Sequence, residues 1–179
     1  METDEIVPNI LPEVPSAKIT IIYPDDKRVE LGQELTPHDV KSQPSVKWDS
    51  DPDKFYTLLM IDPDAPSRKY PFVGEFNHWL VGNIKECDLS TADIIAEYKG
   101  SFPPKYTGLH RYIFLVFEQK DKLTFEEKVA KDSRLQRMRF SVKKFMKKYE
   151  FEKVLAWNYF KAQWCAPEGS QETRTCVCM

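Results

Sequence analysis

The sequence predicts a β-rich α+β domain, because six strand candidates begin early in the chain and the helical spacing comes mostly late, in two stretches. Its 179 residues suit a single domain over 1–179. Two segments, 55–61 and 112–117, are nearly continuous apolar runs, which is typical of strands covered on both faces. The strand candidates are 18–23, 45–48, 55–62, 78–84, 110–118 and 155–163.

The two ends of the chain have their own patterns. Residues 1–16 are rich in proline and acidic residues, and we expect them to form an arm that lies over the domain. Residues 155–160 show the alternation of a half-buried strand. We expect residues 168–179 to form a flexible tail.

Two helices are expected. A short one can be capped by Ser90 or Thr91 and ends at Gly100, with Ile94, Ile95 and Tyr98 as its apolar positions. The second lies within 134–149, where the residues at helical spacing on one face are apolar: Leu135, Met138, Val142, Phe145, Met146 and Tyr149.

The other faces of this second helix are basic and carry no acidic residue: Arg137, Arg139, Lys143, Lys144, Lys147 and Lys148. They form either a solvated surface or a contact for an acidic partner or an anionic lipid surface. Phe140 falls outside the apolar stripe, so either the helix begins near Ser141 or Phe140 faces something else.

Composition excludes several classes of function. The 26 basic and 28 acidic residues give a net charge of -2, which does not indicate nucleic-acid binding. No apolar run approaches the roughly 18 residues of a membrane-spanning helix, so at most peripheral membrane contact is expected. The acidic N-terminus lacks the apolar region of a signal peptide, and the four cysteines show neither zinc spacing nor a convincing disulfide framework. We therefore expect a cytoplasmic monomer.

The segment that follows the strand 55–62 carries the strongest functional signal. It reads Asp62-Pro63-Asp64-Ala65-Pro66-Ser67-Arg68, and because proline cannot pair within a sheet, the strand must end at Asp62. Two later strands begin with His78 and His110. Carboxylates and imidazoles gathered at strand ends are more typical of a ligand site than of packing, although each histidine alone is more often structural.

Such a site would suit an oxyanion. An imidazole can donate to the anion while a carboxylate on its other nitrogen fixes the tautomer. The loop 98–109, which contains Gly100, Gly108 and two prolines, either lines this pocket or is a plain connection. His38 is expected at the surface, at the start of a helix.

Two catalytic alternatives have weaker support. No serine or cysteine stands beside a candidate base in a recognisable nucleophile elbow, so hydrolase roles cannot be assigned. A metal site of two histidines and a carboxylate lacks a closely spaced pair of ligands. We expect no catalytic residue, no metal and no cofactor.

The two motifs resemble the signature segments of the phosphatidylethanolamine-binding protein family, which includes the Raf kinase inhibitor protein. They are Asp62-Pro63-Asp64-Ala65-Pro66-Ser67-Arg68 with His78, and Pro103-Pro104 followed by Thr107-Gly108-Leu109-His110-Arg111-Tyr112. The resemblance extends over nearly the whole chain. It implies a large central antiparallel sheet packed on a smaller sheet, with peripheral helices that include the basic one.

The resemblance also implies function. It implies a non-enzymatic binding protein with a small preformed pocket for phosphate-type anions or the phosphoethanolamine head group, acting as a regulator of signalling. The alternative is a protease or kinase inhibitor that works through surface contacts independent of the pocket. The implied ligand-binding residues are Asp62, Asp64, Ala65, Pro66, His78, Gly100, Pro103, Pro104, His110, Tyr112 and Phe140.

Three positions depart from the family pattern. Val73 stands where animal relatives commonly have tyrosine, and Asn77 stands where a second histidine is common. Phe102 replaces the usual glycine of the proline loop, where a bulky side chain can narrow the mouth or add an apolar lip. These positions bear on head-group selectivity and on any kinase partnership.

The last four residues, Cys176-Val177-Cys178-Met179, fit a C-a-a-X box for prenylation of Cys176. An unmodified tail is the alternative that we favour, because chance matches are common and cysteine at the second "a" is atypical.

Overall fold

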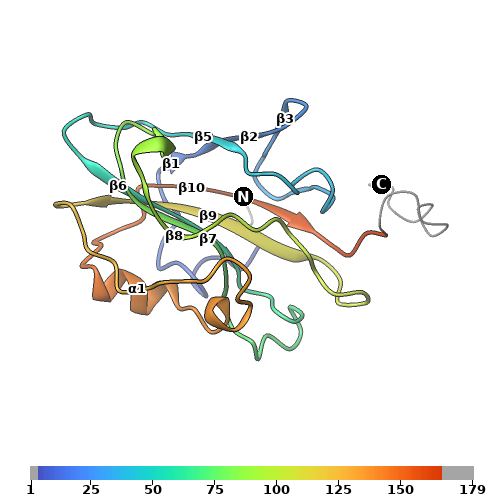
Figure 1. The fold of residues 1–179 in the computed structure, drawn as a ribbon. Coiled ribbons are helices and arrows are strands. Elements are labelled where there is room, and N and C mark those ends of the chain that lie inside the picture. Colours follow the sequence, from blue (N-terminus) through green and yellow to red (C-terminus); the bar gives the residue numbers. More distant parts are fainter. Residues whose placement is uncertain (1–3, 167–179) are drawn as a thin grey trace.

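A large sheet forms the centre of the molecule, with a small sheet on one face and the helix α1 on the other (Figure 1). The computed structural model describes residues 4–166. The large sheet contains β1 (Ala17–Lys18), β4 (Gln33–Glu34), β6 (Phe55–Asp62), β7 (Phe76–Ile84), β8 (Asp93–Ala96), β9 (His110–Gln119) and β10 (Ala156–Ala162). The small sheet contains β2 (Thr20–Tyr23), β3 (Lys27–Arg28) and β5 (Ser45–Lys47).

The large sheet is antiparallel through its long strands and mixed at one edge. Its order is β1-β10-β9-β6-β7-β8, and the pairs from β10 to β8 are all antiparallel. The short strands β1 and β4 pair with β10 in parallel, which a purely antiparallel expectation did not include. Asp62 pairs with Phe76, and Ile61 pairs with Ile113, so the end of β6 meets the starts of β7 and β9.

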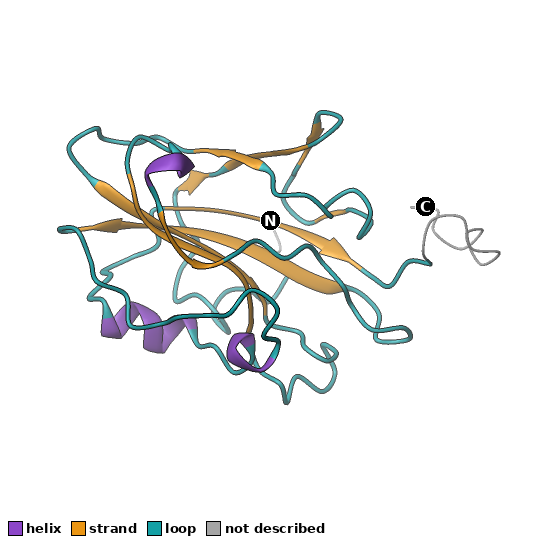
Figure 2. Ribbon diagram, viewed as in Figure 1, coloured by secondary structure: helices purple, strands orange, loops and turns teal. Residues whose placement is uncertain are grey.

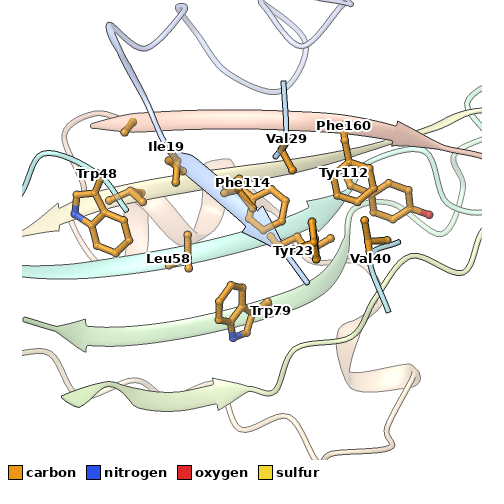
Figure 3. Packing of buried hydrophobic residues seen from close by; sticks show 14 of the residues in the cluster. Ile19, Tyr23, Val29, Val40, Trp48, Leu58, Trp79, Tyr112, Phe114 and Phe160 are labelled. Atoms are coloured by element: carbon orange, nitrogen blue, oxygen red, sulfur yellow. The ribbon is translucent and has the colours of Figure 1, made fainter. Parts of the chain in front are cut away.

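Two hydrophobic clusters cover the two faces of the sheet, which confirms that β6 and β9 are buried on both sides. Successive side chains of a strand point to opposite faces. Thus Leu58 and Phe114 belong to the cluster beneath the small sheet, whereas Leu59 and Leu115 belong to the cluster beneath α1. Figure 3 shows the first cluster between the sheets, with Phe160 from β10 beside Phe114.

The strand β10 corrects one prediction, because Ala156–Phe160 are buried on both faces rather than half-buried. The arm explains the second covered face, since Ile6 and Leu11 are fully buried in the cluster that contains Trp157 and Tyr159. Asn158 is buried as well, and its side chain donates to the backbone oxygens of Ile19 and Val29.

The first expected helix is wrong. Only a 3-10 turn, η1 (Leu89–Thr91), forms, and the segment then extends as β8 (Figure 2). Ile95 packs against the sheet, whereas Ile94 is 67% exposed. Adjacent residues with opposite exposure are typical of a strand, and a segment this short does not separate the two periods. His38 lies in a turn rather than a helix start, and it is half-buried.

The second expected helix is shorter than its apolar stripe. The helix α1 (Val142–Lys148) begins after Ser141, whose side chain accepts a hydrogen bond from the Lys144 amide. The sequence left two explanations for Phe140 lying outside the apolar stripe, and the structure has the one in which the helix begins near Ser141. Leu135 instead belongs to the 3-10 turn η2 (Leu135–Arg137) and is 82% exposed.

Among residues 4–166, no helix is both long enough and apolar enough to cross a membrane. Cys87 is a free thiol, whereas Cys165 is disulfide-bonded, contrary to the expectation of no disulfide. The expected tail 168–179 and the C-a-a-X box at Cys176 lie outside the described residues.

Candidate ligand-binding site

A cavity of about 510 Å³ opens where the end of β6 meets the starts of β7 and β9. Its walls also include the loops that follow β6 and precede β9, and the segment before α1. The lining residues are Pro37, Asp62, Ala65, Pro66, Val73, Phe76, His78, Ser101, Phe102, Pro103, Pro104, His110, Tyr112, Arg134, Met138, Trp164 and Cys165.

Most of the residues expected at the pocket lie together in this cavity. The lining includes Asp62, Ala65, Pro66, His78, Pro103, Pro104, His110 and Tyr112. Asp64, Gly100 and Phe140 do not line it. The ligand-binding role of the lining residues stays a prediction.

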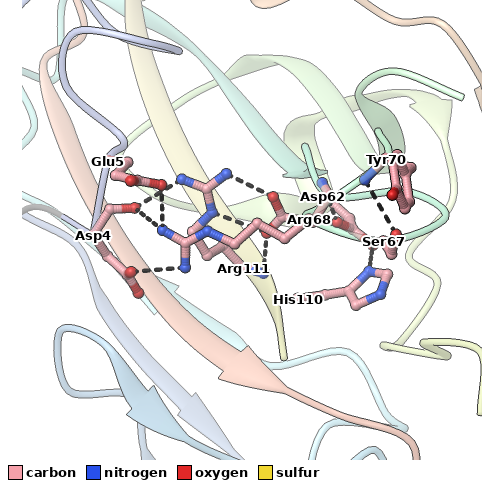
Figure 4. A network of polar contacts seen from close by, with 9 residues as sticks. Asp4, Glu5, Asp62, Ser67, Arg68, Tyr70, His110 and Arg111 are labelled. Atoms are coloured by element: carbon pink, nitrogen blue, oxygen red, sulfur yellow. Dashed lines mark hydrogen bonds and ion pairs between the residues drawn. The ribbon is translucent and has the colours of Figure 1, made fainter. Parts of the chain in front are cut away.

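Asp64 has a structural partner on the other side of the turn. Its carboxylate accepts hydrogen bonds from the backbone N–H of Arg111 at 2.8 Å and from Nε and Nη2 of the same residue at 2.9 Å and 2.6 Å. A further nitrogen of Arg111 donates to the backbone oxygen of Asp4, and Arg68 pairs with Asp4 and Glu5 (Figure 4). Asp64 therefore joins the turn to the arm.

Gly100 and Phe140 support the surrounding loops. A Cβ at Gly100 would lie 2.6 Å from the backbone oxygen of Val40, so glycine is required there by close packing. Gly108, with φ of +77°, is the glycine of this loop that uses a left-handed conformation. The ring of Phe140 packs on Phe145 of α1 at a centroid distance of 5.3 Å.

His78 keeps one ring nitrogen open to the cavity. Its Nδ1 lies 2.7 Å from the backbone oxygen of Lys99, to which it donates. Nε2 makes no hydrogen bond within residues 4–166, although the backbone of Gly100 lies close enough to the ring to raise its pKa slightly. Burial lowers the pKa of His78 from 6.5 to about 4, although the Asp62 carboxylate and the Lys99 carbonyl oppose this shift. The imidazole is therefore neutral near pH 7, and Nε2 carries a lone pair.

Both ring nitrogens of His110 are engaged. Nδ1 lies 2.8 Å from Oδ2 of Asp62, and Nε2 lies 2.9 Å from Oγ1 of Thr107. The Thr107 hydroxyl is also 2.7 Å from the backbone oxygen of Pro104, which ties the proline loop to His110. We expected both imidazoles to donate to one anion, but in this arrangement only His78 has an open nitrogen.

Two buried hydroxyl groups in the lining lack hydrogen-bond partners within residues 4–166: those of Ser101 and Tyr112. Ser101 is 7% exposed and Tyr112 is fully buried. Burial raises the pKa of Tyr112 well above its usual value, and the charges of Asp62 and Asp64 add to this effect. The backbone N–H of Phe102 partly opposes the shift but lies outside hydrogen-bonding geometry. Tyr112 therefore remains a proton donor.

We call Asp62, His78, Ser101, His110 and Tyr112 the polar floor, because all five are less than a tenth exposed. A buried donor without a partner costs about 1–3 kcal/mol. The polar floor thus places two hydroxyl groups without protein partners and one imidazole nitrogen in the wall of the cavity. Sequence reasoning missed Ser101, since an isolated serine in a loop carries no distinctive pattern.

A buried cation next to the polar floor was also missed. The Arg137 guanidinium is 1% exposed and donates to the backbone oxygens of Asn77, His78, Glu97 and Lys131. Within the described chain it has no carboxylate partner, and its charge helps to lower the pKa of His78. The sequence had placed Arg137 on the basic helix, whereas it lies in η2 and points inward.

The three departures from the family pattern have different positions. Val73 and Phe102 line the cavity, whereas Asn77 does not. The Phe102 ring lies 5.2 Å from the His78 ring and 5.4 Å from the Phe76 ring, as measured between centroids. With Pro104 and Arg134 it forms the exposed part of the lining, which we call the mouth.

Among the residues that the structure describes, no three histidine, cysteine or acidic side chains are placed to hold a metal ion.

Comparison with known proteins identifies the family. A family model described as phosphatidylethanolamine-binding protein matches residues 25–160. The chain belongs to this family. Its cavity lies at the two motifs that carry the resemblance, and it has the large sheet and the smaller sheet that the resemblance implied, with two short parallel strands added at one edge. The Raf kinase inhibitor-like subtype stays a prediction.

Three relatives illustrate the range of this family. A Drosophila melanogaster protein named "Putative odorant-binding protein A5" is 41% identical over 165 residues, which are 92% of this chain and 79% of that protein. A solution structure of CG7054 is 42% identical with a TM-score of 0.73, covering 90% of this chain and 92% of that one. A carboxypeptidase Y inhibitor, complexed with its cognate proteinase, is 27% identical with a TM-score of 0.70, covering 83% and 84%.

Proposed function

We propose that this chain is a non-enzymatic binding protein whose cavity takes a phosphate-type anion, such as a phosphate monoester or the phosphoethanolamine head group. The observation that carries the proposal is the pair of buried hydroxyls, Ser101 and Tyr112, without partners in the described chain. A phosphate oxygen accepts hydrogen bonds from both, and charge-assisted bonds of this kind are about twice as strong as neutral ones.

The charges around the polar floor also favour an anion. The Arg137 guanidinium lies against the backbone of His78 and has no carboxylate partner in the described chain. Opposing charges come from Asp62 and Asp64 near Tyr112 and from Glu97 and Asp132 near Arg137. The Asp62 carboxylate is occupied by Nδ1 of His110 and by the backbone N–H of Asp64.

Anion binding is coupled to proton uptake in this arrangement. His78 presents a lone pair at Nε2 and repels a phosphate oxygen until Nε2 is protonated. Phosphate raises the pKa of His78 in the complex by adding a negative charge beside it. We therefore expect phosphate affinity to weaken as the pH rises from 5 to 8, beyond the change that ionisation of phosphate itself produces.

The replacement Tyr112→Phe tests the proposal because it removes one hydroxyl and keeps the ring. Loss of a charge-assisted hydrogen bond of about 1.5–3 kcal/mol lowers the affinity for inorganic phosphate at least about tenfold, as measured by calorimetry. Tyr56→Phe is the matched control, since the Tyr56 hydroxyl is also buried but bonds to Asp51 outside the cavity. Unchanged phosphate affinity in Tyr112→Phe would remove the basis of the proposal.

The wider role that we propose is regulation of signalling by a monomer. We expected a cytoplasmic location, but two observations favour secretion. Disulfides such as that of Cys165 are typical of oxidising compartments, and one relative carries an odorant-binding name. Fractionation of the native cells, with the culture medium included, decides between the two locations.

Inhibition of a protease is the second candidate function, with inhibition of a kinase as its counterpart. The structural likeness to a carboxypeptidase Y inhibitor in complex with its proteinase supports the protease version. Residual carboxypeptidase Y activity with increasing amounts of this chain tests it. An effect retained in Tyr112→Phe would assign the inhibition to surface contacts rather than to the cavity.

A further inference from the structure

Two cations flank the aromatic ring at the mouth of the cavity. Nζ of Lys99 lies 5.4 Å and Cζ of Arg134 lies 5.3 Å from the centroid of the Phe102 ring. Cation–π contacts within about 6 Å hold such side chains in place. Arg134 is itself part of the lining, and Phe102 is 37% exposed. Arg134 of the mouth and the adjoining Lys99 therefore place two positive charges beside an aromatic surface.

Neither cation is neutralised by an acidic residue in the described chain. The ion pairs among residues 4–166 include neither Lys99 nor Arg134, and neither side chain makes a hydrogen bond. Glu97, two residues before Lys99, is instead paired with Lys131 at 3.2 Å. Two unpaired positive charges at the mouth of a cavity repel an ammonium group and attract an anionic one.

A ligand that reaches both the polar floor and the mouth must carry matching groups. The polar floor offers hydroxyl donors for a phosphate, and the volume of about 510 Å³ leaves room for a substituent that extends past Phe102. The ammonium of phosphoethanolamine would meet Lys99 and Arg134, whereas a carboxylate would pair with them.

We propose that the cavity selects small phosphate monoesters that carry a second anionic group, a phosphorylated carboxylic acid, over phosphoethanolamine. This inference rests on the proposed function, because it assumes that the phosphate occupies the polar floor. Lys99, Phe102 and Arg134 are then specificity determinants: the ring positions the two cations, and the cations select the second anionic group.

Four soluble probes separate the two levels of the proposal. Inorganic phosphate tests the polar floor alone, and phosphoethanolamine adds an ammonium. Phosphoglycolate adds a carboxylate, and O-phosphoserine adds both groups. We expect phosphoglycolate to bind at least about tenfold tighter than phosphoethanolamine, because its carboxylate gains ion pairs with the two cations whereas the ammonium of phosphoethanolamine is repelled by them. The affinity for O-phosphoserine should lie between these two.

The double variant Lys99→Gln/Arg134→Gln removes both cations, and calorimetry in low salt measures the preference. We expect the ratio of the two affinities to fall to about twofold or less, because only the weak field of the remaining protein then distinguishes the probes. Arg28→Gln/Lys153→Gln is the matched control, with the same change in net charge at two exposed residues that do not line the cavity. The control keeps the full preference.

The outcomes are distinguishable. Equal affinities for phosphoglycolate and phosphoethanolamine, with inorganic phosphate still bound, overturn the selectivity and leave the proposed function standing. The selectivity is also overturned if the control variant loses the preference for phosphoglycolate as fully as the double variant does. Net charge alone would then explain the preference. Absence of binding by inorganic phosphate and by all three esters overturns the proposed function itself.

The lipid phosphatidylserine carries a carboxylate beside a phosphodiester and is the other source of this chemistry. Phosphatidylcholine vesicles with and without phosphatidylserine provide the comparison. If the soluble monoesters bind and the protein is not retained on phosphatidylserine vesicles, the proposal is supported as stated. Retention on those vesicles with no binding of the soluble monoesters overturns it.

Discussion

Replacing His78 with asparagine should change how stability depends on pH. The imidazole is buried at 2% exposure, and its Nδ1 donates to the Lys99 carbonyl. An asparagine amide nitrogen reaches nearly the same position as Nδ1, so His78→Asn keeps this donor and removes the titrating ring. The two proteins should therefore differ mainly in the pH range where His78 exchanges a proton between the folded and unfolded states.

The sign and the size follow from the lowered pKa. In the unfolded chain His78 titrates near 6.5, and in the folded chain burial lowers its pKa to about 4. Between these two pKa values the unfolded state binds more protons than the folded state. The free energy of unfolding therefore rises as the pH rises and decreases as the pH falls. At about 1.4 kcal/mol for each pH unit, the parent protein loses roughly 3 kcal/mol between pH 6.5 and 4 from this group.

Urea unfolding at several pH values from 4 to 7.5, in buffers without phosphate, measures the effect. Carboxylates also titrate at the acidic end, but they contribute to both proteins and cancel in the difference between them. The parent protein should lose about 3 kcal/mol more than His78→Asn over this range. Parallel stability curves for the two proteins would show that His78 is not held neutral by burial, and the proton coupling proposed for anion binding would lose its basis.

Two further replacements test the supports of the cavity. Arg111→Met leaves the buried Asp64 carboxylate unpaired and should lower the free energy of unfolding by about 3–5 kcal/mol, measured in urea. The control Arg28→Met at the surface should change this free energy little. Equal effects of the two replacements would mean that the pair between Arg111 and Asp64 does not stabilise the fold. Gly100→Ala places a Cβ against the Val40 oxygen and should cost about 1–3 kcal/mol in the free energy of unfolding. Full stability in Gly100→Ala would mean that the loop has room to move.

The sequence predicted the strands that carry the site because their signals are local and strong. The continuous apolar runs of β6 and β9 require two covered faces, and Pro63 ends β6 at Asp62 whatever the rest of the fold does. β8 was missed because a four-residue strand with Ile94 and Ile95 is too short for a period of two to be told from a helical one.

The details of the site depend on contacts that no local pattern records. Asp64 looked like a pocket residue because it stands two positions from Asp62, but Arg111 from β9 reaches it across the turn. Arg137 looked like part of a basic helix, but four carbonyl groups from three separate segments hold it inside. Such partners are set by tertiary packing, so the sequence predicted the composition of the site better than its hydrogen bonds.

The strand β9 joins two places that are remote along the chain. His110 and Tyr112 face the cavity, and Arg111 between them points to the opposite side, where it holds the backbone of Asp4. Any ligand that shifts β9 therefore also pulls on the arm. Amide hydrogen exchange at Ile10 and Leu11, whose N–H groups both donate to the Ile6 oxygen, thus gives a readout of cavity occupancy from the other face of the sheet. An affinity tag fused at the N-terminus would act on the same connection, and Trp164 and Cys165 of the C-terminal end line the cavity itself, so binding measurements on this protein are best made after the tag has been removed.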